Sequence, residues 1–426
     1  MSATRATPTS TGSKLLFVAF LGLLVMAAKA GQAQTETVLY RFCSQPNCVD
    51  GYLPSGTPVL DTTGNVYGTT RNGGAYQYGT LFEIGPDAVE TVRHNFMQGF
   101  GSYPEGSLLT DEKGNLYGTT IGSSYVGLLG SRFFGSVFKL ELRSYRFLHR
   151  FSAENLEDGA QPSAGLVMDA QGNVYGAAGA GGVNGCFTGY GCGAIFELSP
   201  KGTETVLYNF AGGTDDGENP NGSLIFDSAG NLYGTTLHGG IDNPYCVAAC
   251  GTVFELTPSG TETVLYRFKG GPDGGNPIAG LVMDAQGNLY GTTLFGGTSE
   301  GNGWGTVFEI TAGGEEIVLY RFTGEMDGGE PYGGLLLDYQ GNLYGTTFYG
   351  GGTSCYENAG CGTVFKLSPT GVETVLYRFQ GGADGEGPYG VVADAQGNLY
   401  GVTAFGGNYN IACSQRGCGV AFKVTP

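Results

Sequence analysis

Six aspartates stand in loops of the pattern Asp-Gly-x-x-Pro, where carboxylates could bind a cation. They are Asp50, Asp158, Asp216, Asp273, Asp327 and Asp384. Carboxylate oxygens on a glycine-bent loop are typical of calcium sites, so the last five are calcium candidates. A calcium loop needs several alternating oxygen ligands, however, and only the aspartate recurs. We therefore favour a turn in which Asp bonds the backbone and Pro opens the next strand, and we predict no metal or other cofactor.

A second acidic pattern, Asp-x-x-Gly-Asn, occurs in seven copies. They begin at Asp61, Asp111, Asp169, Asp227, Asp284, Asp338 and Asp394. A catalytic centre needs one asymmetric set of groups, whereas seven equivalent copies are typical of a hairpin turn. The three histidines, His94, His149 and His238, stand at no metal-ligand spacing and accompany no nucleophile motif. The sequence thus predicts no catalytic residue and favours a protein that is not an enzyme.

The ten cysteines form five close pairs in the sequence. They are Cys43/Cys48, Cys186/Cys192, Cys246/Cys250, Cys355/Cys361 and Cys413/Cys418. An even count of closely spaced cysteines in an exported chain predicts disulfides within single loops. Zinc is the alternative, but no Cys-x-x-Cys spacing occurs and histidines do not accompany the pairs.

Aromatic residues among the glycines of the long loops are candidates for ligand contact. The positions that we single out are Tyr190, Tyr245, Trp304, Tyr356 and Tyr409. Aromatic faces suit sugar stacking or protein contact, and packing between elements is an equal alternative.

These residues are carried by a repeat whose copies begin 50 to 58 residues apart. Each copy has four short apolar segments, as in 280–284, 288–293, 305–310 and 316–322. Four strands with both faces apolar predict an all-β fold, a seven-bladed β-propeller with sheets packed between sheets. A β-solenoid is the alternative, although its coils are shorter than these units.

The ends of the chain predict how the ring closes. Residues 36–42 are a fourth-type strand without the first three, and residues 390–424 supply three strands without a fourth. We expect the N-terminal strand to complete the last blade, so that 35–426 is one domain. Up-and-down connectivity then places the long loops and all cysteine pairs on one rim, where function is expected.

Residues 1–30 have the composition of a secretory signal peptide. Arg5 and Lys14 precede the apolar run 15–28, and small residues offer cleavage near 30–33. An uncleaved N-terminal anchor is the alternative. Cleavage leaves 17 basic and 38 acidic residues, a net charge of −21, which opposes binding to nucleic acid or anionic membranes. We expect a secreted, periplasmic or envelope protein that is monomeric and has no membrane span after cleavage.

The unit that runs from Tyr266-Arg-Phe through 273–277, 280–284 and 287–293 to Gly305-Thr-Val-Phe resembles the GloVer (Gloeo/Verruco) tandem repeat of bacteria. The resemblance covers residues 35–426. It implies an exported repeat protein and transfers no catalytic residue.

We therefore expect a non-catalytic extracytoplasmic binding or interaction module, with a glycan or protein ligand on the loop-rich rim. One alternative is a propeller enzyme that acts on polysaccharide, as a hydrolase or lyase, which would need two carboxylates or an acid with a histidine near the axis. The other is a purely structural envelope protein.

Overall fold

The computed structural model describes residues 34–99, 101–122, 133–141, 144–152, 158–182, 186, 191–246, 249–299, 303–352, 355, 359–413 and 415–426. The expected signal peptide, 1–30, lies outside these residues. Residues 34–426 form one compact unit. In the described part of the chain, no helix has the length and apolar character needed to cross a membrane.

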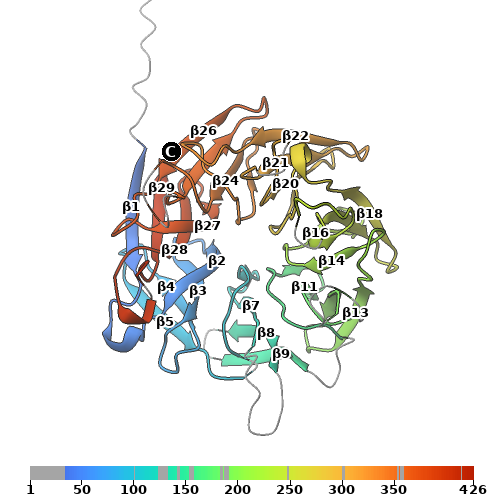
Figure 1. Cartoon of the computed structure of the whole chain (residues 1–426). Helices are drawn as coiled ribbons and strands as arrows, with labels where there is room; N and C mark the ends of the chain where they lie inside the picture. The colour runs from blue at the N-terminus through green and yellow to red at the C-terminus, as the bar shows by residue number, and fades with distance from the viewer. Residues whose placement is uncertain are drawn as a thin grey trace, which may run out of the picture. The chain divides into compact units, whose positions relative to one another are not determined.

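Seven antiparallel sheets stand as blades around a ring, which confirms the predicted seven-bladed β-propeller (Figure 1). The first three blades are β2 (Tyr52–Leu60), β3 (Val66–Asn72), β4 (Thr80–Ile84) and β5 (Glu90–Asn95); β6 (Leu109–Thr110), β7 (Leu116–Thr120), β8 (Phe133–Glu141) and β9 (Ser144–Ser152); and β10 (Val167–Met168), β11 (Val174–Ala178), β12 (Ala194–Leu198) and β13 (Glu204–Asn209). The fourth blade is β14 (Gly217–Pro220) and β15 (Ile225–Phe226), which both pair with β16 (Leu232–Gly239), then β17 (Thr252–Leu256) and β18 (Glu262–Arg267).

The fifth blade is β19 (Val282–Met283), β20 (Leu289–Thr293), β21 (Thr306–Ile310) and β22 (Glu316–Arg321); the sixth is β23 (Leu336–Leu337), β24 (Leu343–Thr347), β25 (Thr363–Leu367) and β26 (Glu373–Arg378). The seventh consists of β27 (Glu386–Ala393), β28 (Leu399–Phe405), β29 (Val420–Thr425) and β1 (Thr35–Arg41). The helical turns η1 (Pro46–Cys48), η3 (Gly271–Asp273) and η5 (Ile411–Cys413) lie in loops.

The seventh blade joins the two ends of the described chain. Strand β1 pairs antiparallel with β29, from Thr35 opposite Thr425 to Arg41 opposite Val420. Figure 1 shows β1 beside β29. Closure by the N-terminal strand, as the sequence predicts, leaves no outer strand missing from the ring.

Phenylalanines hold neighbouring blades together. The Phe that ends each outer strand lies against the Phe of the third strand in the next blade, with ring centroids 4.9 to 5.3 Å apart. The seven pairs are Phe42–Phe82, Phe96–Phe138, Phe151–Phe196, Phe210–Phe254, Phe268–Phe308, Phe322–Phe365 and Phe379–Phe422. All fourteen rings are at most 2% exposed, so this repeated contact forms the core.

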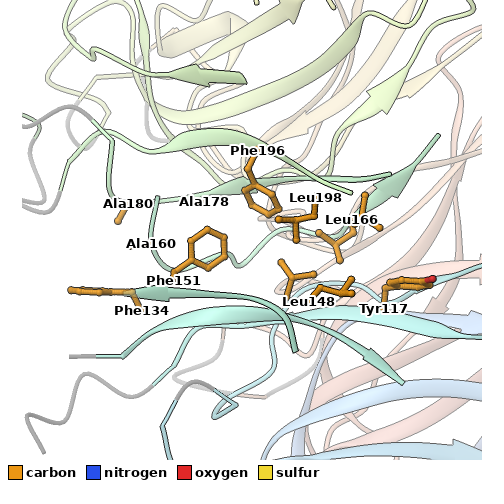
Figure 2. Close-up of a cluster of buried hydrophobic side chains, with 12 residues drawn as sticks. Tyr117, Phe134, Leu148, Phe151, Ala160, Leu166, Ala178, Ala180, Phe196 and Leu198 are labelled. Atoms are coloured by element: carbon orange, nitrogen blue, oxygen red, sulfur yellow. The ribbon is translucent and has the colours of Figure 1, made fainter. Parts of the chain in front are cut away.

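Figure 2 shows this packing between the second and third blades, where Phe151 and Phe196 meet beside Leu148, Leu166 and Leu198. Each third-strand Phe also covers a glycine in the second strand of its own blade. A Cβ on Gly291 would lie 2.6 Å from Cζ of Phe308. The Gly of Leu-Tyr-Gly-Thr-Thr is therefore required by the ring that lies on it.

Candidate functional site

A channel of about 580 Å³ lies where the inner strands of all seven blades converge. The residues that follow the Pro of each repeat line it, and they are Ser55, Glu105, Ser163, Asn221, Ile278, Tyr332 and Tyr389. Each of these side chains is half-buried. We call this set, together with Arg71 and Phe405 on the second strands, the axial site.

Small residues next to these positions allow close approach between the segments at the first strands of neighbouring blades. A Cβ on Gly106 would lie 2.4 Å from the Ala164 oxygen, and one on Gly333 would lie 2.4 Å from the Gly390 nitrogen. The Thr346 hydroxyl donates to the Tyr389 carbonyl of the next blade at 2.9 Å. The backbone around the channel is thus fixed, and the side chains after Pro decide its chemistry.

Blades one to four give the axial site a hydrogen-bonding side. Arg71 and Glu105 form an ion pair at 2.7 Å. The Ser163 hydroxyl donates to the Asn221 side-chain oxygen. Burial raises the pKa of Glu105, and the charge of Arg71 opposes that rise. This side therefore offers hydroxyl, amide and charged groups to a ligand.

Blades six and seven give it an aromatic side. Phe348 lies 4.9 Å from Tyr332 and 6.0 Å from Tyr389, between ring centroids, and 6.3 Å from Phe405. Burial is the main cause that raises the pKa of both tyrosines to about 12, so both phenols are neutral at pH 7. The channel is thus two-sided, although the repeats around it are similar.

The sequence prediction missed the axial site because it looked to the long loops. The signal was present: within an otherwise repeated pattern, the residue after Pro differs between copies, from Ser55 and Glu105 to Ile278 and Tyr389. The residue after the second strand's Gly-Thr-Thr differs in the same way, as Arg71 and Phe348 do.

The Asp-Gly-x-x-Pro carboxylates lie separately, at the junctions where the outer strand of one blade and the loop after it meet the outer strand of the next. In five junctions a tyrosine of the outer strand donates its hydroxyl to the Asp at 2.8 to 3.0 Å. The pairs are Tyr40–Asp50, Tyr208–Asp216, Tyr266–Asp273, Tyr320–Asp327 and Tyr377–Asp384. A backbone N–H of the loop donates to each carboxylate as well, as Ala211 does to Asp216 at 2.7 Å. These contacts give the carboxylates turn-forming partners, and calcium binding stays an untested alternative.

A glutamate at the start of the next blade's outer strand lies beside these aspartates. Burial first, and the Asp charge second, raise the pKa of this carboxyl to about 7 in five junctions. The residues are Glu36, Glu90, Glu262, Glu316 and Glu373. At the sixth junction Asp158 faces His149 and Glu204 instead.

The Asp-x-x-Gly-Asn aspartates form hairpin turns with the same contacts in every blade. Asp284 Oδ1 accepts the N–H groups of Gln286 and Asn288 at 2.9 Å, and Oδ2 accepts the Asn288 amide and the Tyr290 hydroxyl. Partial burial opposes ionisation of Asp61, but hydrogen bonds from Thr63 and Asn65 outweigh it and lower its pKa to about 2. These carboxylates are occupied within the turn.

The five predicted disulfides are confirmed, each within one loop. They join Cys43 to Cys48, Cys186 to Cys192, Cys246 to Cys250, Cys355 to Cys361 and Cys413 to Cys418.

The predicted rim aromatics have different environments in the structure. Tyr245 and Tyr409 are 47% and 62% exposed. Trp304, in the loop between β20 and β21, packs on Gly324 and Gly329 of the loop after β22. Tyr190 and Tyr356 lie outside the described residues. Contact of these side chains with a ligand stays a prediction.

Comparison with known proteins identifies the repeat. The family model of the Gloeobacter/Verrucomicrobia repeat matches residues 22–248 and 246–426. No protein with a curated description matches the sequence.

Among solved structures, the extracellular domain of a one component system protein from B. thetaiotaomicron is 12% identical with a TM-score of 0.51, over 89% of this chain and 40% of that one. A gluconolactonase from Xanthomonas campestris is 13% identical with a TM-score of 0.41, over 92% of this chain and 89% of that one. A luciferin-regenerating enzyme is 13% identical with a TM-score of 0.42, over 92% and 95%. The first likeness shows the fold alone.

Proposed function

The chain belongs to the Gloeobacter/Verrucomicrobia repeat family, and from that premise we propose that it is a non-catalytic extracytoplasmic binding module that takes a carbohydrate in its axial channel. The observation that carries the proposal is the two-sided axial site. Hydrogen-bonding residues lie on blades one to four, and aromatic residues lie on blades six and seven.

A sugar ring matches this division. Its C–H faces stack on aromatic rings, and its hydroxyls donate to and accept from polar side chains and the backbone. Tyr332 and Tyr389 supply rings, while Ser163, Asn221 and Glu105 supply donors and acceptors. A volume of about 580 Å³ is in the range of ordinary small-ligand sites.

The number of carboxylates in the axial site favours ligand binding over glycoside hydrolysis. Among the described residues that line the channel, Glu105 is the one carboxylate, and Arg71 pairs with it. Most glycoside hydrolases use two carboxylates that flank the scissile bond. The axial channel therefore offers one of the two carboxylates that a polysaccharide-acting enzyme of this kind would need.

Disulfides favour an extracytoplasmic location, and the net charge argues against one class of ligand. Disulfides persist in oxidising compartments, and five are present. The net charge of −18 opposes nucleic acid as the ligand.

The test incubates the purified protein with a panel of insoluble polysaccharides, then assays the pellet for protein and the supernatant for released oligosaccharide. We expect protein in the pellet without release. Release of oligosaccharide would overturn the non-catalytic proposal, and failure to bind any member of the panel would overturn the carbohydrate proposal.

Two variants decide where the ligand binds. Asn221→Ala removes a polar group from the axial site, and Tyr409→Ala removes an exposed aromatic from the rim. We expect Asn221→Ala to weaken binding about two- to tenfold, as the loss of one hydrogen bond does, and Tyr409→Ala to leave it unchanged. The opposite pattern would place the ligand on the rim, as the sequence alone predicts.

A further inference from the structure

We propose that His149, Asp158 and Glu204 bind a divalent cation of the zinc type at the junction between the second and third blades. Their ligand atoms lie within 4.8 Å of one another. The three residues come from the outer strand of blade two, the loop after it and the outer strand of blade three. None of them lines the axial channel.

The separations fit a metal better than they fit hydrogen bonds. His149 Nε2 lies 3.5 Å from Asp158 Oδ2 and 3.6 Å from Glu204 Oε2. A hydrogen bond between such atoms spans about 2.7–3.2 Å. Around tetrahedral zinc, bonds of about 2.0–2.2 Å place neighbouring ligand atoms about 3.3–3.6 Å apart.

Each of the three residues also has a buried polar atom that finds no hydrogen-bond partner among the described residues. These atoms are Nε2 of His149, Oδ1 of Asp158 and Oε1 of Glu204. The Asp158 side chain is 9% exposed. A carboxylate so buried is costly unless it is paired or binds a metal, and a shared cation would satisfy all three groups.

The other junctions act as internal comparisons. Five of them carry tyrosine where blade two has His149, and each tyrosine hydroxyl reaches its Asp at an ordinary hydrogen-bond length. The exchange of Tyr for His at this junction replaces a well-placed donor with a nitrogen that lies 3.5 and 3.6 Å from the two carboxylates, beyond hydrogen-bond length.

The donor set indicates which metal binds. One imidazole and two carboxylates suit zinc and similar transition metals, whereas calcium takes oxygen ligands. Three protein ligands leave a fourth tetrahedral position for water or for a group of a partner molecule.

The test titrates the purified, chelator-treated protein with Zn²⁺ by calorimetry and with Co²⁺ by absorption spectroscopy. We expect one equivalent of either metal, a tetrahedral Co²⁺ spectrum, and a higher melting temperature with zinc. Absence of zinc binding, or an octahedral Co²⁺ spectrum, would overturn the proposal.

The matched variant is His149→Tyr, which recreates the Tyr–Asp–Glu set of the other junctions and so should fold. Removal of a ligand should weaken zinc more than about 100-fold, since loss of a residue that only orients a ligand costs about 10–100-fold. Unchanged affinity in a folded His149→Tyr would overturn the assignment. Conversely, Tyr208→His places histidine beside Asp216 and Glu262, and a second equivalent of zinc is expected.

Discussion

The rings of His94 and Tyr145 lie face to face, with centroids 3.7 Å apart and 9° between their planes. Five junctions hold tyrosine at the first of these positions, and glutamate stands at the second in all other repeats. The loop between them, 100–104, also lacks the aspartate. The three changes occur together, so at this junction a stacked pair replaces the usual Tyr–Asp–Glu group.

Replacement of His94 tests the stack. His94→Ala should lower the free energy of unfolding by about 1–3 kcal/mol, because an aromatic contact and buried volume are lost. His94→Phe keeps a flat ring and should retain most of that stability. Urea denaturation of both variants at pH 7 measures the difference, and equal losses would show that stacking contributes nothing.

The pH dependence of the free energy of unfolding gives a second test of His94. Burial lowers the pKa of His94 to about 4, below its ordinary 6.5. The unfolded chain binds the proton first, so His94 contributes stability that is present above pH 6.5 and lost as the pH falls toward 4. The stability that is lost as the pH falls from 6.5 toward 4 should be smaller in His94→Phe than in the parent protein.

The junction glutamates predict the opposite slope near neutral pH. Their pKa of about 7 lies above the ordinary 4.5, so the folded state holds more protons between those values. Stability from this source is complete below pH 4.5 and is lost as the pH rises through 7. Burial raises the pKa of Glu204 to about 7 as well. Six junction glutamates therefore oppose His94, and the free energy of unfolding should fall from pH 5 to pH 8. A steady rise over that range would contradict the prediction.

A single substitution tests whether the junction glutamates cause this decline in stability. Glu316→Gln removes one buried titrating group and should flatten the decline between pH 5 and pH 8. Its exposed neighbour supplies the control, since Glu315→Gln should leave the curve unchanged. Urea unfolding at each pH provides the measurement.

The hydrogen bond from Tyr320 to Asp327 predicts a loss of stability when the tyrosine hydroxyl is removed. Tyr320→Phe removes the hydroxyl that reaches Asp327 at 3.0 Å, while the Thr323 N–H remains at 2.9 Å. We expect a loss of about 1–3 kcal/mol, typical of a hydrogen bond to a charged group. Tyr339→Phe, at a residue 96% exposed, should change stability by less than about 0.5 kcal/mol. If millimolar calcium stabilised the parent protein but not Asp327→Asn, the turn interpretation would be wrong.

The glycine beneath each third-strand Phe predicts a steric penalty. An added Cβ on Gly291 would lie 2.6 Å from Phe308 Cζ and 2.8 Å from Leu281 Cδ2. Gly291→Ala should therefore cost about 1–3 kcal/mol or more, because the buried ring has no room to move. Gly313→Ala, in an exposed turn with nothing closer than 3.7 Å, should be close to neutral. Thermal melting of both variants tests this.

The fold could be predicted from sequence because the residues that determine it recur in every copy. Asp284-x-x-Gly-Asn specifies a turn, and residues such as Phe308 and Phe322 mark the third and fourth strands. The five disulfides followed from spacing alone.

The site was harder to predict because it depends on differences between copies and on contacts between blades. Glu105 and Tyr389 follow equivalent prolines 284 residues apart, and only the ring brings them to one channel. His149 stands at no metal-ligand spacing in the sequence because Glu204 comes 55 residues later, and only packing of neighbouring blades places the two side chains together.

The pairing of Thr35 with Thr425 has a consequence for biosynthesis. Among the strands of the ring, β1 leaves the ribosome first and its partner β29 last, so β1 keeps an open edge until β29 emerges. Gln34 and Pro426 flank the paired Thr35 and Thr425, at the place where other blades have a tight turn, such as 257–261. A circular permutant that joins these two residues and opens the loop after β18 would make every blade contiguous in translation order.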